Sequence, residues 1–468
     1  MTMKLNALFL IVLTGFGGSS LSARTYTLPE LLQLGLENSK EVKMVFEEQR
    51  KVASQVSEAY GKALPSIDLT ANYSYAFEQY SALGGGMSGG SSGSIADILH
   101  SAHVDTAAQS GSYVLANVLD NLFAGFADMT KDQTASLTLS INQALFAQGK
   151  VGIGLTIAKV YREGLEAKYA NAVQSAKATT TRLFYAALLA KKRQEIQQES
   201  VTLREEVLRL SRIQFAVGKG SELDTISARL GYEKSLVDRQ NAEDSLHLTE
   251  DILMQRIGLP ADPSFDVTGE FIMEPYLVDY ETAQEKMEKR NYSLIQLKKG
   301  LEVQNQLVKL ARSDHYPMIY CGASLGKISQ FNQGDAMEWY DNQSVFVGMK
   351  MNLFNGFTIF QKTRQAQSDK RSYEVNLSLV QDGLDIGLKN AVNQLDVNHK
   401  RLESSVTLLK LAEKGYVLAK KAYEVGSKTL VDLNNAEIDW KQAKLAFHAS
   451  QFGYLSAVID VKLLLGEL

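Results

Sequence analysis

Four stretches of the chain alternate apolar and polar side chains with a period of two, which is typical of β-strands with one apolar face. The clearest is the first, in which Ile67 and Leu69 alternate with Asp68 and Thr70. The predicted strands lie near 66–79, 134–146, 318–331 and 343–354. Each pattern runs for about 10 residues, the length that a tilted strand needs to cross a bilayer, but a half-buried sheet in a soluble protein gives the same alternation.

Aromatic residues near the strand ends favour the membrane interpretation. Tyr73 and Phe77 lie toward the end of the first strand, and Trp339 and Phe346 lie near the fourth. Such rings are enriched at the headgroup level of a bilayer. Four strands cannot close a barrel alone, and lipid does not tolerate an open sheet edge. Either the sheet belongs to a soluble protein, or several chains contribute strands to one barrel.

The longest predicted helices exceed those of a compact domain. Residues 155–217 contain no proline and would extend about 95 Å as one helix. Residues 358–425 repeat this pattern, again without proline. The last helix carries a heptad seam that alternates large and small residues: Leu433, Ala436, Trp440, Ala443, Phe447, Ser450, Tyr454, Ala457, Val461 and Leu464. Such helices need partners along their length, which either an extended assembly or a coiled-coil scaffold would supply.

The chain is an internal duplication, and most matching positions are 208 residues apart. The matching pairs include Leu145 and Leu353, Val217 and Val425, Gly218 and Gly426, Asp224 and Asp432, and Gly258 and Gly466. Pro65 and Pro317 match at a wider offset of 252, so the first copy contains an insertion of 44 residues. A Gly/Ser-rich tract lies in this insertion and predicts a long loop at 81–131. We expect a first repeat at 24–259, a linker at 260–278 and a second repeat at 279–468.

The N-terminus predicts export. Lys4 precedes an apolar run and then a stretch of small residues, the pattern of a secretory signal peptide at 1–23, with cleavage near Ser22 or Ala23. The apolar run is too short for a membrane-spanning helix, and no later stretch is long and apolar enough to form one. If the exported protein enters a membrane, it must do so as strands.

Composition and motifs argue against several other functions. A formal net charge of −4 argues against nucleic acid as a partner, and the single cysteine excludes an internal disulfide framework. The six histidines are scattered, without the spacing of a zinc protease. The one close pair, His100 and His103, is a weak candidate for a surface metal. We therefore expect no enzyme activity, no cofactor and no metal centre.

Two matching segments resemble the TolC family of outer-membrane efflux proteins. The first is the run Tyr423-Glu424-Val425-Gly426-Ser427-Lys428-Thr429-Leu430-Val431-Asp432-Leu433-Asn434-Asn435-Ala436, and the second is its repeat at 215–224. The resemblance covers the chain from about residue 26 and occurs twice in the same order. It implies a mainly α fold with membrane β-structure: a homotrimeric α-barrel below a shared twelve-stranded β-barrel, to which each chain gives four strands.

The resemblance also implies a function and its partners. In this family the trimer is a channel in the outer membrane that extends into the periplasm and exports small molecules or proteins. It works in a tripartite efflux or type I secretion complex, with a periplasmic adaptor and an inner-membrane pump, and is gated at its periplasmic end. The resemblance does not specify the cargo. A soluble periplasmic coiled-coil scaffold or adaptor is the alternative, although it leaves the four strands unexplained.

The same resemblance assigns roles to residues at the two helical turns. It places Asp432 and Asn435 at the pore constriction, where Asn435 stands in place of a second acidic residue and weakens the expected cation site. It places Asp224, Tyr423 and Lys428 in a latch that holds the closed state, with Lys428 in place of an arginine. It assigns adaptor contact to the tips of the turns, which comprise Val217, Gly218, Val425 and Gly426.

Overall fold

The computed structural model describes residues 24–75, 132–218, 220–260, 262 and 264–468. The predicted signal peptide at 1–23, the whole of the predicted loop at 81–131, and the candidate metal pair His100 and His103 lie outside these residues. The chain divides into two compact units. One, the helical unit, comprises 1–54, 159–305 and 368–468, and the other, the strand unit, comprises 55–158 and 306–367.

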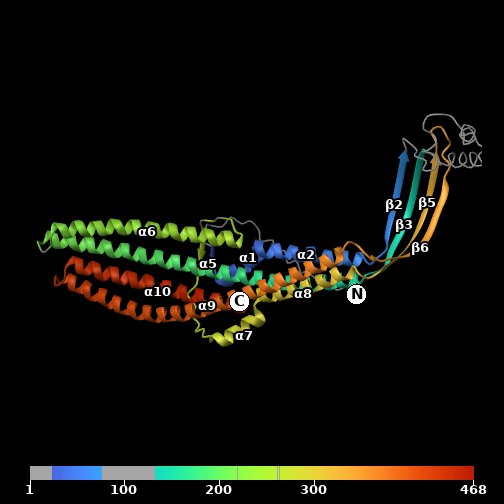
Figure 1. The fold of residues 1–468 in the computed structure, drawn as a ribbon. Coiled ribbons are helices and arrows are strands. Elements are labelled where there is room, and N and C mark those ends of the chain that lie inside the picture. Colours follow the sequence, from blue (N-terminus) through green and yellow to red (C-terminus); the bar gives the residue numbers. More distant parts are fainter. Residues whose placement is uncertain (1–23, 76–131, 219, 261, 263) are drawn as a thin grey trace, which may run out of the picture. The chain divides into compact units, whose positions relative to one another are not determined.

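The strand unit contains one four-stranded antiparallel sheet in the order β2-β3-β5-β6 (Figure 1). Its strands are β2 (Ser66–Tyr75), β3 (Gln133–Ala147), β5 (Met318–Phe331) and β6 (Tyr340–Lys350). The fourth strand was expected to continue to 354, but its pairing ends where Lys350 faces Met318 at the start of β5. Residues 351–357 continue past the last partner and have no strand structure.

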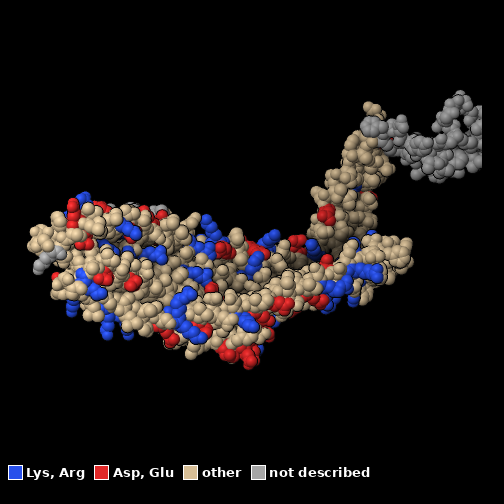
Figure 2. Space-filling view, turned by 60° about the vertical axis from the view of Figure 1, so that its left-hand side comes forward, with Lys and Arg blue, Asp and Glu red and all other residues tan. Residues whose placement is uncertain are grey.

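Strand register brings the apolar positions of all four strands onto one face of the sheet. Ile67 lies opposite Ile141, Ile141 lies opposite Ala323, and Ala323 lies opposite Val345. Side chains on this face are largely exposed, with Val345 at 85%. Serine, threonine and asparagine dominate the other face of β2 and β3. The strands are mostly uncharged in the space-filling view (Figure 2).

A charged pair interrupts the apolar face near the hairpin that joins β5 and β6. Lys327 lies opposite Asp341, and its Nζ atom is 3.3 Å from the Asp341 carboxylate. Because Lys327 lies on the otherwise apolar face, the alternation at 318–331 is the least regular of the four predicted strand patterns. The partner of this lysine, which is on the neighbouring strand, offsets the charge at the end of the sheet where water is accessible.

The helical unit contains two pairs of long helices that lie side by side (Figure 1). The first pair is α5 (Lys150–Ala216) with α6 (Glu222–Ile257), and the second is α9 (Thr358–Glu424) with α10 (Leu430–Leu465). Shorter helices accompany them: α1 (Leu28–Asn38), α2 (Lys40–Gly61), α7 (Tyr280–Arg290) and α8 (Tyr292–Ser313). The ends of α2, α5, α8 and α9 extend into the strand unit. No helix in the described part of the chain has an apolar stretch that could cross a membrane.

Apolar clusters hold the helical unit together. One cluster packs Leu31 of α1 against Phe184 of α5 and Leu253 of α6. A short parallel pair, β1 (Arg24–Tyr26) with β4 (Phe265–Val267), joins the same cluster. Strand β4 lies within the stretch expected to be an irregular linker, because three residues are too few to show a strand period in the sequence.

The seam of the last helix is buried along much of its length. Leu433 and Val461 are fully buried, and Tyr454 packs in a second cluster with α7 and α9. Near its start, the seam departs from the expectation. Ala436 is only half-buried, whereas the neighbouring Glu437 is 2% exposed.

Candidate gate at the helical turns

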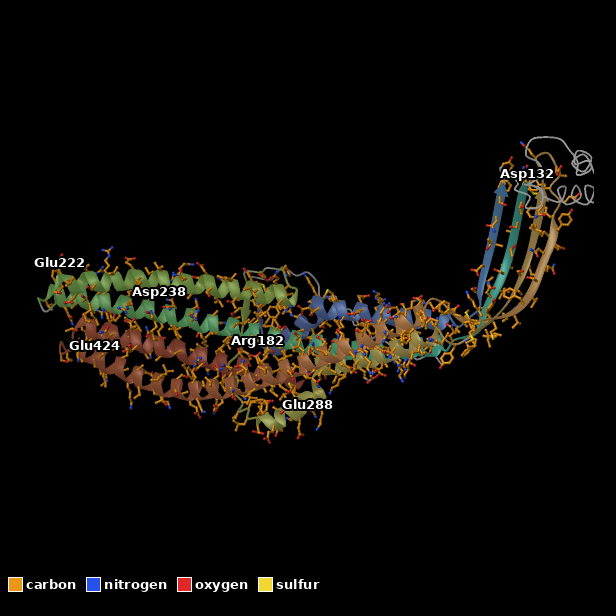
Figure 3. All side chains as sticks on the ribbon, viewed as in Figure 1. Asp132, Arg182, Glu222, Asp238, Glu288 and Glu424 are labelled. Carbon is orange, nitrogen blue, oxygen red and sulfur yellow. The ribbon has the colours of Figure 1, made fainter. Side chains whose placement is uncertain are left out.

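Two tight turns join the long helices, one in each repeat. Gly218 has a φ of 73° and Gly426 has a φ of 79°, the left-handed conformation that ends a helix and that glycine adopts without steric cost. Val217 and Val425 stand exposed beside them, at 62% and 79%. Glu222 at the start of α6 and Glu424 at the end of α9 mark the same end of the helical unit in Figure 3.

An aspartate caps the helix that follows each turn. The Asp432 carboxylate accepts hydrogen bonds from the backbone N–H and the hydroxyl of Thr429, at 3.0 and 2.8 Å. Asp224 accepts the equivalent bonds from Ser221, at 3.2 and 2.7 Å. These reciprocal caps satisfy N–H groups at the helix start. The bonds from Thr429, with the nearby Lys428, lower the pKa of Asp432, so this exposed carboxylate carries a negative charge at neutral pH.

The predicted latch residues are only partly brought together. Tyr423 is 4% exposed within an apolar cluster that includes Leu208, Ala228 and Leu433. Burial raises the pKa of Tyr423, the charge of Asp224 raises it further, and Ser211 acts in the opposite direction. Asp224 is therefore close enough to act on Tyr423, but its carboxylate is hydrogen-bonded to Ser221, and no hydrogen bond links it to Tyr423.

Lys428 and Asn435 lie near Asp432 at the start of α10. The Lys428 ammonium is 3.9 Å from the Asp432 carboxylate, and both side chains are about half exposed. An exposed pair at this distance contributes little to stability. Asn435 is exposed one turn beyond Asp432 on α10. In this protomer, the Lys428 ammonium therefore lies beside Asp432, the acidic group assigned to the constriction.

A buried ion pair that the sequence analysis did not anticipate lies further along the helices. Arg204 of α5 and Glu437 of α10 approach to 3.0 Å, with side chains 12% and 2% exposed. Arg204 also donates to the Asn434 side chain at 2.6 Å, and Ser200 donates to Glu437 at 3.4 Å. One Glu437 carboxylate oxygen has no hydrogen-bond partner in the described part of the chain. Burial raises the pKa of Glu437 despite the attraction of Arg204.

Further polar contacts connect α5 with α10. Arg182 pairs with Asp460, and Glu199 pairs with Lys444. Lys444 also lies over the ring of Trp440, which stacks on Tyr416 at a centroid distance of 5.0 Å. Because α5 belongs to the first repeat and α10 to the second, these contacts bind the two repeats within one chain.

No local pattern in the sequence could identify the Arg204–Glu437 pair. The two residues are 233 positions apart, and each lies on a helix rich in charged residues. The only available signal was Glu437 within the period of the last helix, next to the assigned seam residue Ala436. A charged residue at such a position is buried only when it has a partner, which sequence periodicity cannot supply.

The fold combines long paired helices with a four-stranded sheet whose apolar face is exposed. The sequence pattern of the outer membrane efflux protein family matches residues 31–259 and 284–467. The chain therefore belongs to that family, and the resemblance found in its turn motifs is confirmed. It is an outer-membrane efflux or secretion channel protein that reaches into the periplasm.

Individual relatives are distant in sequence and close in fold. The chain is 22% identical over 365 residues to the outer membrane protein TolC of Vibrio cholerae, covering 74% of this chain and 82% of that protein. It is 24% identical over 294 residues to the alkaline protease secretion protein AprF of Pseudomonas aeruginosa, covering 60% of this chain and 59% of AprF. The Campylobacter jejuni CmeC outer membrane channel has a similar fold, with a TM-score of 0.73, 18% identity, and coverage of 94% of this chain and 85% of CmeC.

Proposed function

We propose that three copies of this chain assemble into one export duct. Each copy would give four strands to a twelve-stranded barrel and its long helices to a tunnel in the periplasm. The observation that carries this proposal is the sheet: one continuous apolar face and, at β2 and β6, two edges without a partner strand among the described residues. Neighbouring copies would pair with these edges, as lipid requires.

Exposed apolar side chains on the long helices support the same assembly. On α6, Leu223 and Leu230 are each 70% exposed. On α9, Leu379 and Ile386 are 69% and 72% exposed. Apolar positions in such number on a soluble surface mark contacts between proteins. In a trimer, α6 of one copy would cover α9 of the next.

The turns would form the gate at the periplasmic end of this duct. Three Asp432 carboxylates around a threefold axis would form a ring that favours cations over anions. The cluster around Tyr423 and the ion pair of Arg204 and Glu437 would hold the closed state, in which each protomer keeps its two helix pairs together. Opening would separate these pairs, and an adaptor bound at Val217 and Val425 would stabilise the open form. An inner-membrane pump would supply the cargo, a small molecule or a protein.

Conductance in planar lipid bilayers tests the gate. The purified protein should form channels of low conductance, and Tyr423→Ala should raise that conductance several-fold because it removes a buried side chain from the closed turns. Tyr292→Ala, which truncates the same residue type at the start of α8, is the matched control and should conduct like the wild type. Equal conductance in all three proteins would refute a gate at the turns, and a protein that forms no channel would refute the duct.

A further inference from the structure

An exposed apolar cluster follows the last strand, where the chain leads from β6 into α9. Residues 351–357 have no strand or helix structure. Leu353, Phe354 and Phe357 are 88%, 77% and 67% exposed, and Phe360 on the first turn of α9 is 51% exposed. The rings of Phe354 and Phe357 pack edge to face with centroids 5.5 Å apart. This group, the 353–360 cluster, is too apolar to face water alone.

Phe357 occupies a backbone conformation that disfavours it. Its φ is 64°, in the left-handed region where side chains with a Cβ are strained. The equivalent position of the first repeat, 208 residues earlier, is Gly149, with a φ of 73°. The two turns also share a hydrogen bond, from Gln361 N to the Phe357 carbonyl at 3.0 Å and from Ile153 N to the Gly149 carbonyl at 3.2 Å. Each turn thus has two residues with positive φ, of which one is glycine: Gln148 and Gly149 in the first repeat, and Gly356 and Phe357 in the second. The non-glycine residue of the second turn is an exposed phenylalanine.

Unpaired cations surround the 353–360 cluster. Lys350 ends β6, and Lys362 and Arg364 lie on the first turns of α9. Within the described part of the chain, neither Lys350 nor Lys362 forms an ion pair, and Arg364 lies over the Phe360 ring at 4.9 Å. The sequence contains no acidic residue between Asp341 and Asp369. The local surface is therefore both apolar and positively charged.

We propose that the 353–360 cluster inserts into the periplasmic leaflet of the outer membrane, where Lys362 and Arg364 bind the phosphates of anionic phospholipids. Lys350 alternates with Met349 on β6 and lies on the other face of the sheet, so it takes no part. Aromatic rings prefer the boundary between headgroups and acyl chains, and nearby cations add attraction to anionic lipid. The cluster continues the apolar face of β6, on which Val347 and Met349 are 73% and 70% exposed. Insertion would explain why the non-glycine residue of this turn is a phenylalanine here, whereas it is Gln148 in the first repeat. This inference rests on the proposed barrel.

Quenching of tryptophan by brominated phospholipids tests the proposal. Phe357→Trp, made in a Trp339→Phe background and reconstituted as the full-length protein, should be quenched most by lipid brominated close to the headgroup. Brominated phosphatidylglycerol should quench several-fold more than brominated phosphatidylcholine at equal fraction. Lys362→Gln with Arg364→Gln should abolish that preference, whereas Lys410→Gln, an exposed lysine of α9 in the helical unit, should not change it.

Two reference positions separate the possible failures. Val345→Trp reports a lipid-facing strand residue, and Val217→Trp reports the exposed turn in the periplasm. Quenching at 345 but not at 357 would overturn the inference, because a neighbouring protein surface would then cover the cluster. Equal quenching of 357 by both lipids would overturn the anionic preference. An unquenched residue 345 would refute the barrel itself. Phe357→Gly, which restores the residue of the first repeat, checks that the turn folds without the ring.

Discussion

At the scale of single residues, we expect the largest loss of stability from changes to the buried pair of Arg204 and Glu437. Replacing Arg204 with alanine leaves an acidic group buried without its partner, which costs about 3–5 kcal/mol. Glu437→Gln removes the anionic partner of Arg204 but keeps a side chain that can accept a hydrogen bond from Ser200, so it should cost less than Arg204→Ala. Thermal unfolding of the two purified variants in detergent measures the difference. If both variants kept the stability of the wild type, the pair would not stabilise the contact between α5 and α10.

Asp432 both caps the start of α10 and carries a negative charge at the proposed constriction, and separate variants can test these two roles. Asp432→Asn should lower the cation preference of the channel, measured as the reversal potential across a salt gradient, because it removes three charges from the proposed ring. Thr429→Val removes the hydrogen bond from the hydroxyl to Asp432 but keeps the carboxylate. It should cost about 1 kcal/mol of stability and leave selectivity intact. A selectivity change in the threonine variant alone would contradict the assignment of Asp432 to the constriction.

His448 makes the helical unit sensitive to acid. Its ring lies between Phe447 and Phe271, with centroids 5.2 and 6.2 Å away, and burial lowers its pKa below the ordinary value. The folded protein thus binds the proton less tightly than the unfolded chain, so stability falls as pH drops below about 6.5. His448→Gln should reduce the fall in melting temperature between about pH 7.5 and about pH 5.5. The variant His315→Gln, at an exposed position, should show the same fall as the wild type.

At the scale of secondary-structure elements, the repeated turns depend on glycine at one position. Gly426→Ala should destabilise the protein by about 1 kcal/mol, because alanine is strained at a φ of 79°. Gly415→Ala lies within α9, where a Cβ meets no neighbouring atom, and should stabilise the helix by up to about 1 kcal/mol. The same substitution should therefore have opposite effects at two positions on one hairpin. Destabilisation by both would show that the Gly426 conformation is not the cause.

Helices and strands were predicted well where the pattern of apolar and polar residues extended over many positions. The expected helix at 155–217 corresponds to α5, and the one at 358–425 corresponds to α9. The alternation at 318–331 matches β5, in spite of Lys327, because the residue that neutralises the lysine lies on the next strand. The end of β6 was placed too late because apolar residues continue after the ladder stops, and those residues form the 353–360 cluster.

The candidate site was less predictable than the fold for a physical reason. The turns were recognised from local motifs, because glycines and helix-capping residues reflect the backbone geometry of the turn itself. The contacts of Tyr423 and Glu437 depend on how two distant helix pairs pack, and no local pattern carries that information. The residue roles at the constriction and the latch therefore remain proposals, while the outer-membrane efflux family and its fold are established by comparison.

At the scale of the whole molecule, the duplication gives each chain two similar halves with the same turns, caps and glycine ends. Gly258 and Gly466 end the second helix of each half with φ values of 73° and 71°. Three such chains would place six similar units around one axis, which suits a closed ring of helices. The two halves differ at the strand ends, where Gly149 and Phe357 occupy equivalent turns.

The number of chains in the native assembly tests this account most directly. The protein should be extracted from isolated outer membranes in mild detergent, crosslinked, and sized by native mass spectrometry, with a boiled sample as reference. We predict an assembly of three chains in the outer-membrane fraction that dissociates on boiling. A soluble single chain in the periplasm would contradict the shared barrel, because four strands with two open edges cannot cross a membrane alone.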